Sequence, residues 1–170
     1  PHKVNSKVNE EDEFEDDCDV DGGKMPPAQS TVWKGGVWKS GHFAGEWRAG
    51  RFKGSSFSGV WHDGVWQSGI WNDGEWKKGE WRGGVWNSGT WYDGVWHSGH
   101  WKYGFWFGGE WHDGDWYHGE WTGGAWYGGN WFGGDWSGGD WMGGYIFDWK
   151  KGELVKSAVS PVEFYDRHSP

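Results

Sequence analysis

The sequence predicts an all-β protein whose central repeat folds as a four-sided β-solenoid, with about 20 residues per coil and a core of stacked tryptophans. Three observations lead to this prediction. Gly and Trp, with 34 and 21 copies, make up about a third of the 170 residues. A tryptophan stands at every fifth position from Trp61 to Trp141. The variable residues between the tryptophans resemble one another at intervals of about 20 positions. The alternative is an antiparallel β-meander of three-residue strands with a one-sided Trp ladder.

The composition excludes most other architectures. Leu, Ile and Val are too sparse for a helix-packed or sandwich core, and a Gly inside a helix is about 1 kcal/mol less favourable than an Ala. No apolar run approaches the roughly 20 residues of a membrane-spanning helix, so we expect no membrane insertion. Gly does not recur at every third position, which excludes collagen. The single cysteine, Cys18, cannot form an intrachain disulfide.

The chain divides into three segments by composition. Residues 1–30 hold 9 acidic and 3 basic residues, which is typical of a flexible arm. Residues 31–144 form the Trp/Gly pentapeptide-repeat domain, whose 12 acidic and 9 basic residues argue against a nucleic-acid partner. Residues 145–170 interrupt the repeat, and we expect them to cap the end of the stack and form a tail. Because the chain starts at Pro1 rather than Met, we expect an excised or processed piece of a longer protein.

The repeat unit reads x-Trp-x-x-Gly. Between Trp33 and Phe57 it is looser, because Phe43, Phe52 and Phe57 take the aromatic position and two of the steps are four residues long. Gly tolerates the backbone angles of a corner and leaves room beside an indole, while a buried Trp covers about 200 Å² of apolar surface. We therefore expect a structural core made of Trp61, Trp66, Trp71, Trp76, Trp81, Trp86, Trp91, Trp96, Trp101, Trp106, Trp111, Trp116, Trp121, Trp126, Trp131, Trp136 and Trp141.

The variable positions favour the solenoid over the meander. A meander predicts similarity at every second unit because its strands alternate in direction, whereas a four-sided coil predicts similarity at every fourth unit. The residue before the Trp position of the unit is apolar or aromatic in one column with the longer interval: Val65, Val85, Phe105, Ala125 and Tyr145, the last of which precedes Ile146. With four aromatic positions per coil, the chain would make nearly six coils and a rod of roughly 28 Å at about 4.8 Å per coil.

Over residues 33–144 this pattern resembles the pentapeptide-repeat proteins, in which a small and a large apolar residue two positions apart point inward. Gly and Trp occupy those two positions here, and the resemblance implies a four-sided right-handed β-helix. A more distant resemblance is to MORN repeats, whose Gly-Glu-Trp-x-x-Gly core recurs at residues 45–50 and 74–79. The short Trp/Gly repeats are also similar to those of phage and other virion structural proteins, which implies a virion or extracellular location.

Aromatic residues at variable positions form the candidate binding surface. Phe107 and Tyr127 are separated by four units, so the four-sided coil predicts that they stack. Exposed aromatic patches mark contacts with sugar rings or with other chains, although aromatic residues also favour any pleated surface. The candidate residues are Tyr103, Phe105, Phe107, Tyr117, Tyr127 and Phe132.

Two patterns suggest metal sites. Asp17, Asp19 and Asp21 match the opening of a calcium loop, in which alternate carboxylates converge on the cation. Ala28 stands where such a loop needs a Glu, so a solvated acidic arm is the competing interpretation. In a four-sided coil His97, His100 and His118 could approach one another and bind zinc, while surface filling is the alternative.

These observations favour a non-enzymatic structural or scaffolding module, part of a virion fibre or another large assembly with other protein chains as partners. No Ser or Cys nucleophile stands in a recognisable catalytic motif, so we expect no enzyme activity. The alternative is a carbohydrate- or protein-binding module that uses the outward aromatic residues. Calcium at the acidic arm is the one cofactor considered.

Overall fold

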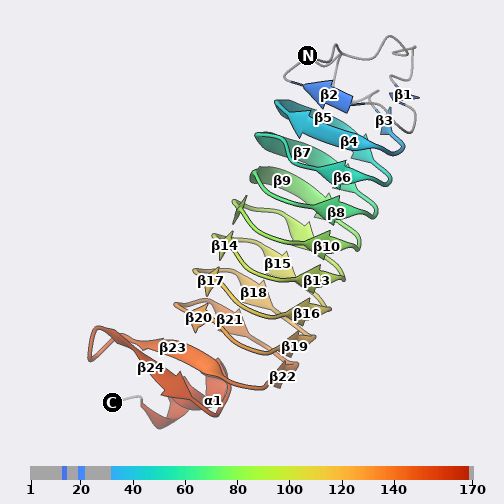
Figure 1. Cartoon of the computed structure of the whole chain (residues 1–170). Coiled ribbons are helices and arrows are strands. Elements are labelled where there is room, and N and C mark those ends of the chain that lie inside the picture. Colours follow the sequence, from blue (N-terminus) through green and yellow to red (C-terminus); the bar gives the residue numbers. More distant parts are fainter. Residues whose placement is uncertain (1–12, 15–18, 22–31, 169–170) are drawn as a thin grey trace.

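The protein is a rod of about 8 stacked β-coils, shown by a computed structural model that describes residues 13–14, 19–21 and 32–168. The coils follow one another from the N-terminal to the C-terminal end of the rod (Figure 1). Paired strands of successive coils are parallel, for example at Trp66 and Trp81. This confirms the predicted β-solenoid with a stacked Trp core, and it excludes the antiparallel meander.

Each coil closes after three repeat units, so the prediction of four sides was wrong, and the coil is one unit shorter than expected. Trp81 lies in register with Trp66 in the preceding coil and with Trp96 in the following one. Within a coil, neighbouring indoles meet edge to face, with Trp81 and Trp86 at 5.9 Å and 70°. Three planar rings related in this way fill a triangular cross-section at the density of a protein interior, whereas a fourth side would leave space at the centre.

Each side of the rod carries one column of short strands. The first face holds β3 (Val32–Trp33), β12 (Thr90–Trp91), β15 (Phe105–Trp106), β18 (Glu120–Trp121) and β21 (Asp135–Trp136). The second face holds β4 (Val37–Ser40), β6 (Arg51–Phe52), β8 (Val65–Trp66), β10 (Glu80–Trp81), β13 (Val95–Trp96), β16 (Glu110–Trp111), β19 (Ala125–Trp126) and β22 (Asp140–Trp141). The third face holds β11 (Val85–Trp86), β14 (His100–Trp101), β17 (Asp115–Trp116), β20 (Asn130–Trp131) and β23 (Gly144–Asp148). Two short strands from the N-terminal segment add to this stack: β1 (Glu13–Phe14) pairs with β3, and β2 (Asp19–Asp21) pairs with β4.

The two four-residue steps of the sequence, from Phe43 to Trp47 and from Phe57 to Trp61, make the N-terminal coils one residue shorter than the later ones. β5 (His42–Trp47) and β7 (Ser56–Trp61) run without interruption from the third face onto the first and pair over their full length. Trp47 and Trp61 are therefore one position closer in sequence than the next pair of the same column, Trp61 and Trp76. In β9 (Ile70–Trp76) the step has its regular length, and the extra residue produces a register shift against β7.

Backbone hydrogen bonds and corner glycines join the coils. Val95 N–H donates to Gly79 O at 2.9 Å, and His97 N–H donates to Trp81 O at 2.8 Å, a pattern that repeats along the rod. Gly94, at the corner before Val95, has a φ of 122°, in the left-handed region that favours glycine. A β-carbon on Gly94 would lie 2.4 Å from Gly79 O in the preceding coil. Glycine is thus required at this corner by its backbone angle and by the close approach of the coils.

Aromatic rings, most of them indoles, fill the interior. Trp81 stacks on Trp96 at 4.7 Å with an interplanar angle of 5°, and the tryptophans from Trp33 to Trp131 are fully buried. Several indole N–H groups donate to a corner carbonyl of the next coil, as Trp66 Nε1 does to Gly83 O at 3.0 Å. Others, including Trp71 Nε1, are buried without an acceptor within hydrogen-bonding distance.

A hairpin and a helix cover the C-terminal end of the stack. Ile146 in β23 takes the aromatic position next to Trp131. The chain then reverses, and β24 (Glu153–Ser157) pairs antiparallel with β23. Ser160 caps the N-terminus of α1 (Pro161–Arg167), and Phe164 of α1 is buried in the same cluster as the tryptophans. These elements close an edge that would otherwise be open to pairing with another chain.

Candidate binding surface

The residues on either side of each Trp form the outer surface. Because strands that are three units apart pair in register, like positions of successive coils make columns parallel to the rod axis. The core is nearly uniform, so the differences between the three faces lie in these columns.

An aromatic column follows the Trp position on the third face. Tyr117 and Phe132 stack at 5.0 Å with an interplanar angle of 11°. Phe132 and Phe147 are 5.8 Å apart and tilted by 34°. Trp149, in the hairpin turn after β23, meets Phe147 edge to face at 4.6 Å. We call the exposed and half-buried rings of this face, Tyr103, Tyr117, His118, Phe132, Phe147 and Trp149, the third-face strip; Tyr103 and His118 pair beside the main column at 5.6 Å.

A polar column runs beside the third-face strip. The Asp115 carboxylate accepts a hydrogen bond from Asn130 Nδ2 at 2.9 Å and lies 3.1 Å from His100 Nδ1. Partial burial raises the pKa of Tyr117, and the negative charge of Asp115 and their hydrogen bond raise it further. The column therefore combines a carboxylate, an amide and an imidazole that already hold one another in place.

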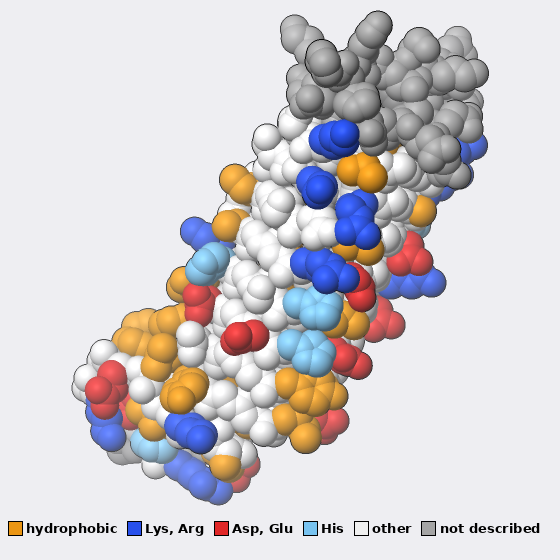
Figure 2. All heavy atoms as spheres, in the orientation of Figure 1, with side chains coloured by type: hydrophobic (Ala, Val, Ile, Leu, Met, Phe, Trp, Pro, Cys, Tyr) orange, Lys and Arg blue, Asp and Glu red, His pale blue; other side chains and the backbone are white. Residues whose placement is uncertain are grey.

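The second face changes from basic to aromatic along the rod. In the column after each Trp, Lys39 and Lys53 lie near the N-terminal end, while His112 and Tyr127 lie further on. His97 and His112 stack at 5.9 Å, and His112 and Tyr127 at 4.9 Å. Figure 2 shows this order along one side of the rod, with Lys and Arg near the N-terminal end, His next and apolar side chains last.

The first face carries a shorter aromatic pair. Phe107 stacks on Tyr92 at 5.5 Å, and Lys77 Nζ lies 4.8 Å from the centre of the Tyr92 ring. Phe105 lies in the neighbouring column, in register with Thr90.

The structure places the six predicted aromatic residues on all three faces. Five are exposed, and Phe132 is half-buried. The predicted stack of Phe107 on Tyr127 was wrong, because a three-sided coil puts Phe107 on the first face and Tyr127 on the second. Tyr117 and Phe132 do come together. The sequence reasoning missed Phe147 and Trp149, although Phe147 follows Phe132 by three units in the same column.

The candidate metal ligands are only partly described. The backbone of Asp19–Asp21 forms β2, whereas Asp17 lies outside the described residues, so the calcium site stays a prediction. His97 lies on the second face, while His100 and His118 belong to the third, so the three do not form one group. Among residues 32–168, no three His, Cys, Asp or Glu side chains are grouped as metal ligands.

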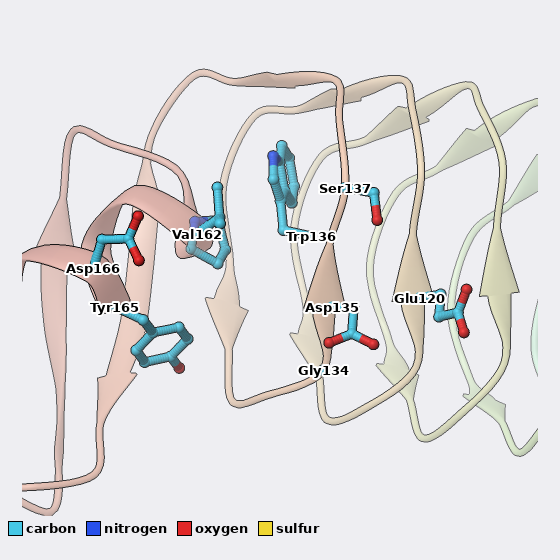
Figure 3. A pocket seen from close by; sticks show the side chains of 9 residues that line it. Glu120, Gly134, Asp135, Trp136, Ser137, Val162, Tyr165 and Asp166 are labelled. Carbon is cyan, nitrogen blue, oxygen red and sulfur yellow. The ribbon is translucent and has the colours of Figure 1, made fainter. Parts of the chain in front are cut away.

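Two clefts flank the C-terminal helix. The larger, of about 430 Å³, lies between α1 and the first face, with the side chains of Glu120, Asp135, Tyr165 and Asp166 around it (Figure 3). The smaller, of about 210 Å³, lies on the other side of α1 and includes Ser157 and His168.

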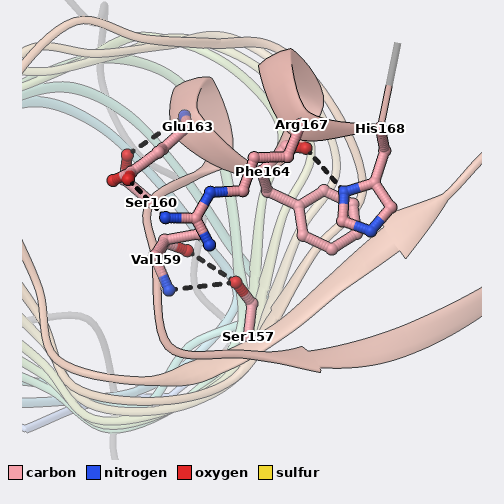
Figure 4. Close-up of polar contacts among 7 residues, drawn as sticks. All are labelled: Ser157, Val159, Ser160, Glu163, Phe164, Arg167 and His168. Atoms are coloured by element: carbon pink, nitrogen blue, oxygen red, sulfur yellow. Dashed lines mark hydrogen bonds and ion pairs between the residues drawn. The ribbon is translucent and has the colours of Figure 1, made fainter. Parts of the chain in front are cut away.

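Ser157 and His168, which line the smaller cleft, both contact the backbone. The Ser157 hydroxyl donates to Val159 O at 2.7 Å and accepts from Val159 N–H at 3.1 Å (Figure 4). His168 Nδ1 lies 2.8 Å from Phe164 O. Both side chains are therefore engaged with the backbone of the cap.

No helix in the described part of the chain is long and apolar enough to cross a membrane. Comparison of the sequence and structure with protein families, with curated proteins and with solved structures finds no match.

Proposed function

We propose that this chain is a non-enzymatic structural module, a rigid rod that acts as a spacer or docking element between other protein chains of a larger assembly. The uninterrupted core of stacked indoles is the observation that carries the proposal. Between Trp61 and Trp131 every aromatic position is filled by a fully buried Trp. A hinge needs a weakly packed segment, and this stretch contains none.

Rigidity follows from the way each coil is held. Successive coils share backbone hydrogen bonds between parallel strands on all three faces, and their indoles from Trp61 to Trp141 stack at 4.6–5.1 Å through the centre of the rod. Each coil touches only its neighbours. A bend of the rod would therefore have to open the contacts between successive coils on one side and compress them on the other.

The setting that we propose is a virion fibre or a comparable extracellular assembly. The short Trp/Gly unit supports a likeness to repeats of virion structural proteins, and the inward Gly and Trp pair supports a likeness to pentapeptide repeats. The three-sided coil departs from the four-sided coil of that second group. Both likenesses are analogies of construction rather than evidence of shared activity.

Distances between spin labels test the rigid-spacer role. Lys53, Arg82 and Met142 lie in one column of the second face, so that six coil steps separate the first from the last and four separate the second from the last. After Cys18→Ser, the pairs Lys53→Cys/Met142→Cys and Arg82→Cys/Met142→Cys should each give one narrow distance distribution in electron–electron double resonance. Their means should differ by about 10 Å, the rise of two coils. Broad or multiple distributions in the folded protein would contradict the proposal.

A further inference from the structure

Trp149 is the one strongly exposed indole of the described chain. Its side chain is 67 % exposed, whereas the core tryptophans up to Trp131 are inaccessible to solvent. The ring lies beside Gly133 on the outside of the third face, where a β-carbon on Gly133 would approach Trp149 Cζ2 to 4.0 Å. The hairpin turn thus returns a large aromatic ring onto the outer surface of the rod, where it extends the third-face strip.

Trp149 differs in ring orientation from the stacked pair Tyr117 and Phe132. Tyr117 and Phe132 are nearly parallel, so each uses its face for its neighbour and turns its edge outward. Trp149 is rotated by 69° from Phe147, so the two do not stack face to face. An aromatic ring attracts C–H groups at its electron-rich face and electron-rich oxygen atoms at its edge. The strip therefore offers an indole for stacking, followed by a row of ring edges.

The charge of this face limits the ligand. In the columns beside the Trp positions from Trp101 to Trp131, the third face carries the cation Lys102 and the anion Asp115. Asp115 is paired with Asn130 and His100. The exposed Lys150 and Lys151 follow Trp149 in the hairpin turn, beyond these columns. Along the columns themselves, a polyanion or a strongly cationic peptide meets one charge of the opposite sign. A neutral ligand that has one apolar face and a rim of hydrogen-bonding groups fits the strip and its polar column together.

We propose that the third-face strip binds a neutral glycan, with the C–H face of one pyranose ring on the Trp149 indole and the sugar chain extended along the rod axis. The hydroxyl groups of the sugars face the column of His100, Asp115 and Asn130. Successive strip rings are 5.0 and 5.8 Å apart, comparable with the length of one pyranose ring. This inference does not depend on the spacer role, because a strip can bind sugar on a rod of any function.

Calorimetric titration of the full chain with neutral hexasaccharides tests the proposal. The probes are cellohexaose, hexa-N-acetylchitohexaose, xylohexaose, mannohexaose and maltohexaose. At least one should bind saturably, and Trp149→Ala should weaken that binding tenfold or more, a loss of about 1.4 kcal/mol. Trp149→Phe should retain part of the affinity, and Asn130→Ala should weaken it severalfold. Tyr127→Ala is the matched control, because Tyr127 is 45 % exposed but lies on the second face.

Tryptophan fluorescence locates the bound sugar independently. Acrylamide should quench mainly Trp149, because nearly all the other indoles are buried, and a bound hexasaccharide should reduce this quenching.

Four results would overturn the proposal. The first is the absence of saturable binding for all five sugars up to about 10 mM, and the second is equal affinity in Trp149→Ala. The third is sedimentation that depends on concentration and loses this dependence in Trp149→Ala, which would assign the strip to a second copy of the chain. The fourth is Trp149-dependent binding to phosphatidylcholine/phosphatidylglycerol vesicles in the absence of sugar binding, which would assign it to a membrane surface.

Discussion

At the scale of single residues, the corner glycines and the core indoles have separate roles. A corner glycine lets the backbone turn with a positive φ against the preceding coil. An indole fills one third of the cross-section and stacks on the rings of the two neighbouring coils. Because the two roles rest on different contacts, substitutions should separate them.

Two glycines at neighbouring corners should respond differently to a β-carbon. Gly99 has a φ of 133°, and its β-carbon would lie 2.5 Å from Gly84 O. Gly99→Ala should therefore lower the free energy of unfolding by about 3 kcal/mol, through backbone strain and the clash. Gly83 is the control, because its added β-carbon meets no atom closer than 3.9 Å. Urea denaturation of both variants measures the difference, and equal losses would contradict this account of the corner.

Two core tryptophans differ in the hydrogen bonding of their indole N–H. Trp66 Nε1 donates to Gly83 O at 3.0 Å, whereas Trp71 Nε1 is buried without an acceptor. Both lie next to a phenylalanine of the preceding coil, Phe52 and Phe57 respectively, so a Phe is compatible with either column. Trp66→Phe should be more destabilising than Trp71→Phe by about 1 kcal/mol, because only the first loses a hydrogen bond. Thermal and urea unfolding of the pair provide the measurement; a larger loss in Trp71→Phe would refute the argument.

At the scale of the element, the terminal hairpin depends on one buried carboxylate. Asp148 is 5 % exposed, and its Oδ1 accepts hydrogen bonds from the backbone N–H groups of Lys151 at 3.2 Å and Lys150 at 2.9 Å. The bond from Lys151 lowers the pKa of Asp148 most; the bond from Lys150 and the charges of His168 and Lys151 lower it further, against the opposing effect of desolvation.

The stability that Asp148 contributes should depend on pH. A lowered pKa means that the charged form is favoured by folding, so this stability is present above the ordinary pKa of about 4. It is lost as the pH falls through the lowered pKa. Asp148→Asn should thus destabilise the protein at pH 6 and have a smaller effect at pH 2.5, as measured by urea denaturation of both proteins. An effect that is independent of pH would show that the side chain acts by shape alone.

The spacing of the tryptophans determined part of the fold of each coil but not the number of its sides. The regular spacing of Trp indicated inward indoles and a β-solenoid, and both are confirmed. The number of sides could not follow from the core, because every unit places the same residue inward whether three or four units close a coil. The outer columns and the irregular steps do indicate three units per coil. The short steps begin at Phe43 and Phe57, three units apart, and Tyr117 and Phe132 are also three units apart.

The candidate surface was predictable to a similar extent. Tyr117 and Phe132 were identified because they belong to the repeat and follow a core Trp directly. Trp149 was not identified, because it lies beyond the repeat and reaches the third face only through the turn between β23 and β24. Such a position depends on tertiary packing, which a repeat pattern does not encode.

At the scale of the whole molecule, the core and the surface have different periods. The core repeats with every unit because each unit contributes one equivalent Trp, whereas the surface repeats with every third unit because its columns belong to separate faces. A change of one whole unit should therefore preserve the core while it rotates all the following units by one face. No single-residue substitution can rotate the surface columns in this way while it leaves the core unchanged.

Removal of residues 106–110 should be milder than truncation of Trp106 alone. The deletion joins Phe105 to Trp111, which then takes the place of Trp106 next to Trp91, and every later Trp still finds an aromatic partner in the preceding coil. The loss should be less than about 1 kcal/mol, because marginal stability amounts to about 0.05–0.15 kcal/mol per residue. Trp106→Ala instead leaves a cavity in the stack and should lower the unfolding free energy by about 3–5 kcal/mol.

The same deletion should alter the surface in a defined way. Contacts that span the deleted unit, such as the stack of His97 on His112 and the pair of His100 and Asp115, should disappear. Contacts beyond it, such as Tyr117 on Phe132, should remain. Urea denaturation compares the stabilities, and NMR titration of the histidines follows the contacts. If the deletion proved more destabilising than Trp106→Ala, the specific outer columns, rather than the indole stack, would be what holds successive coils together.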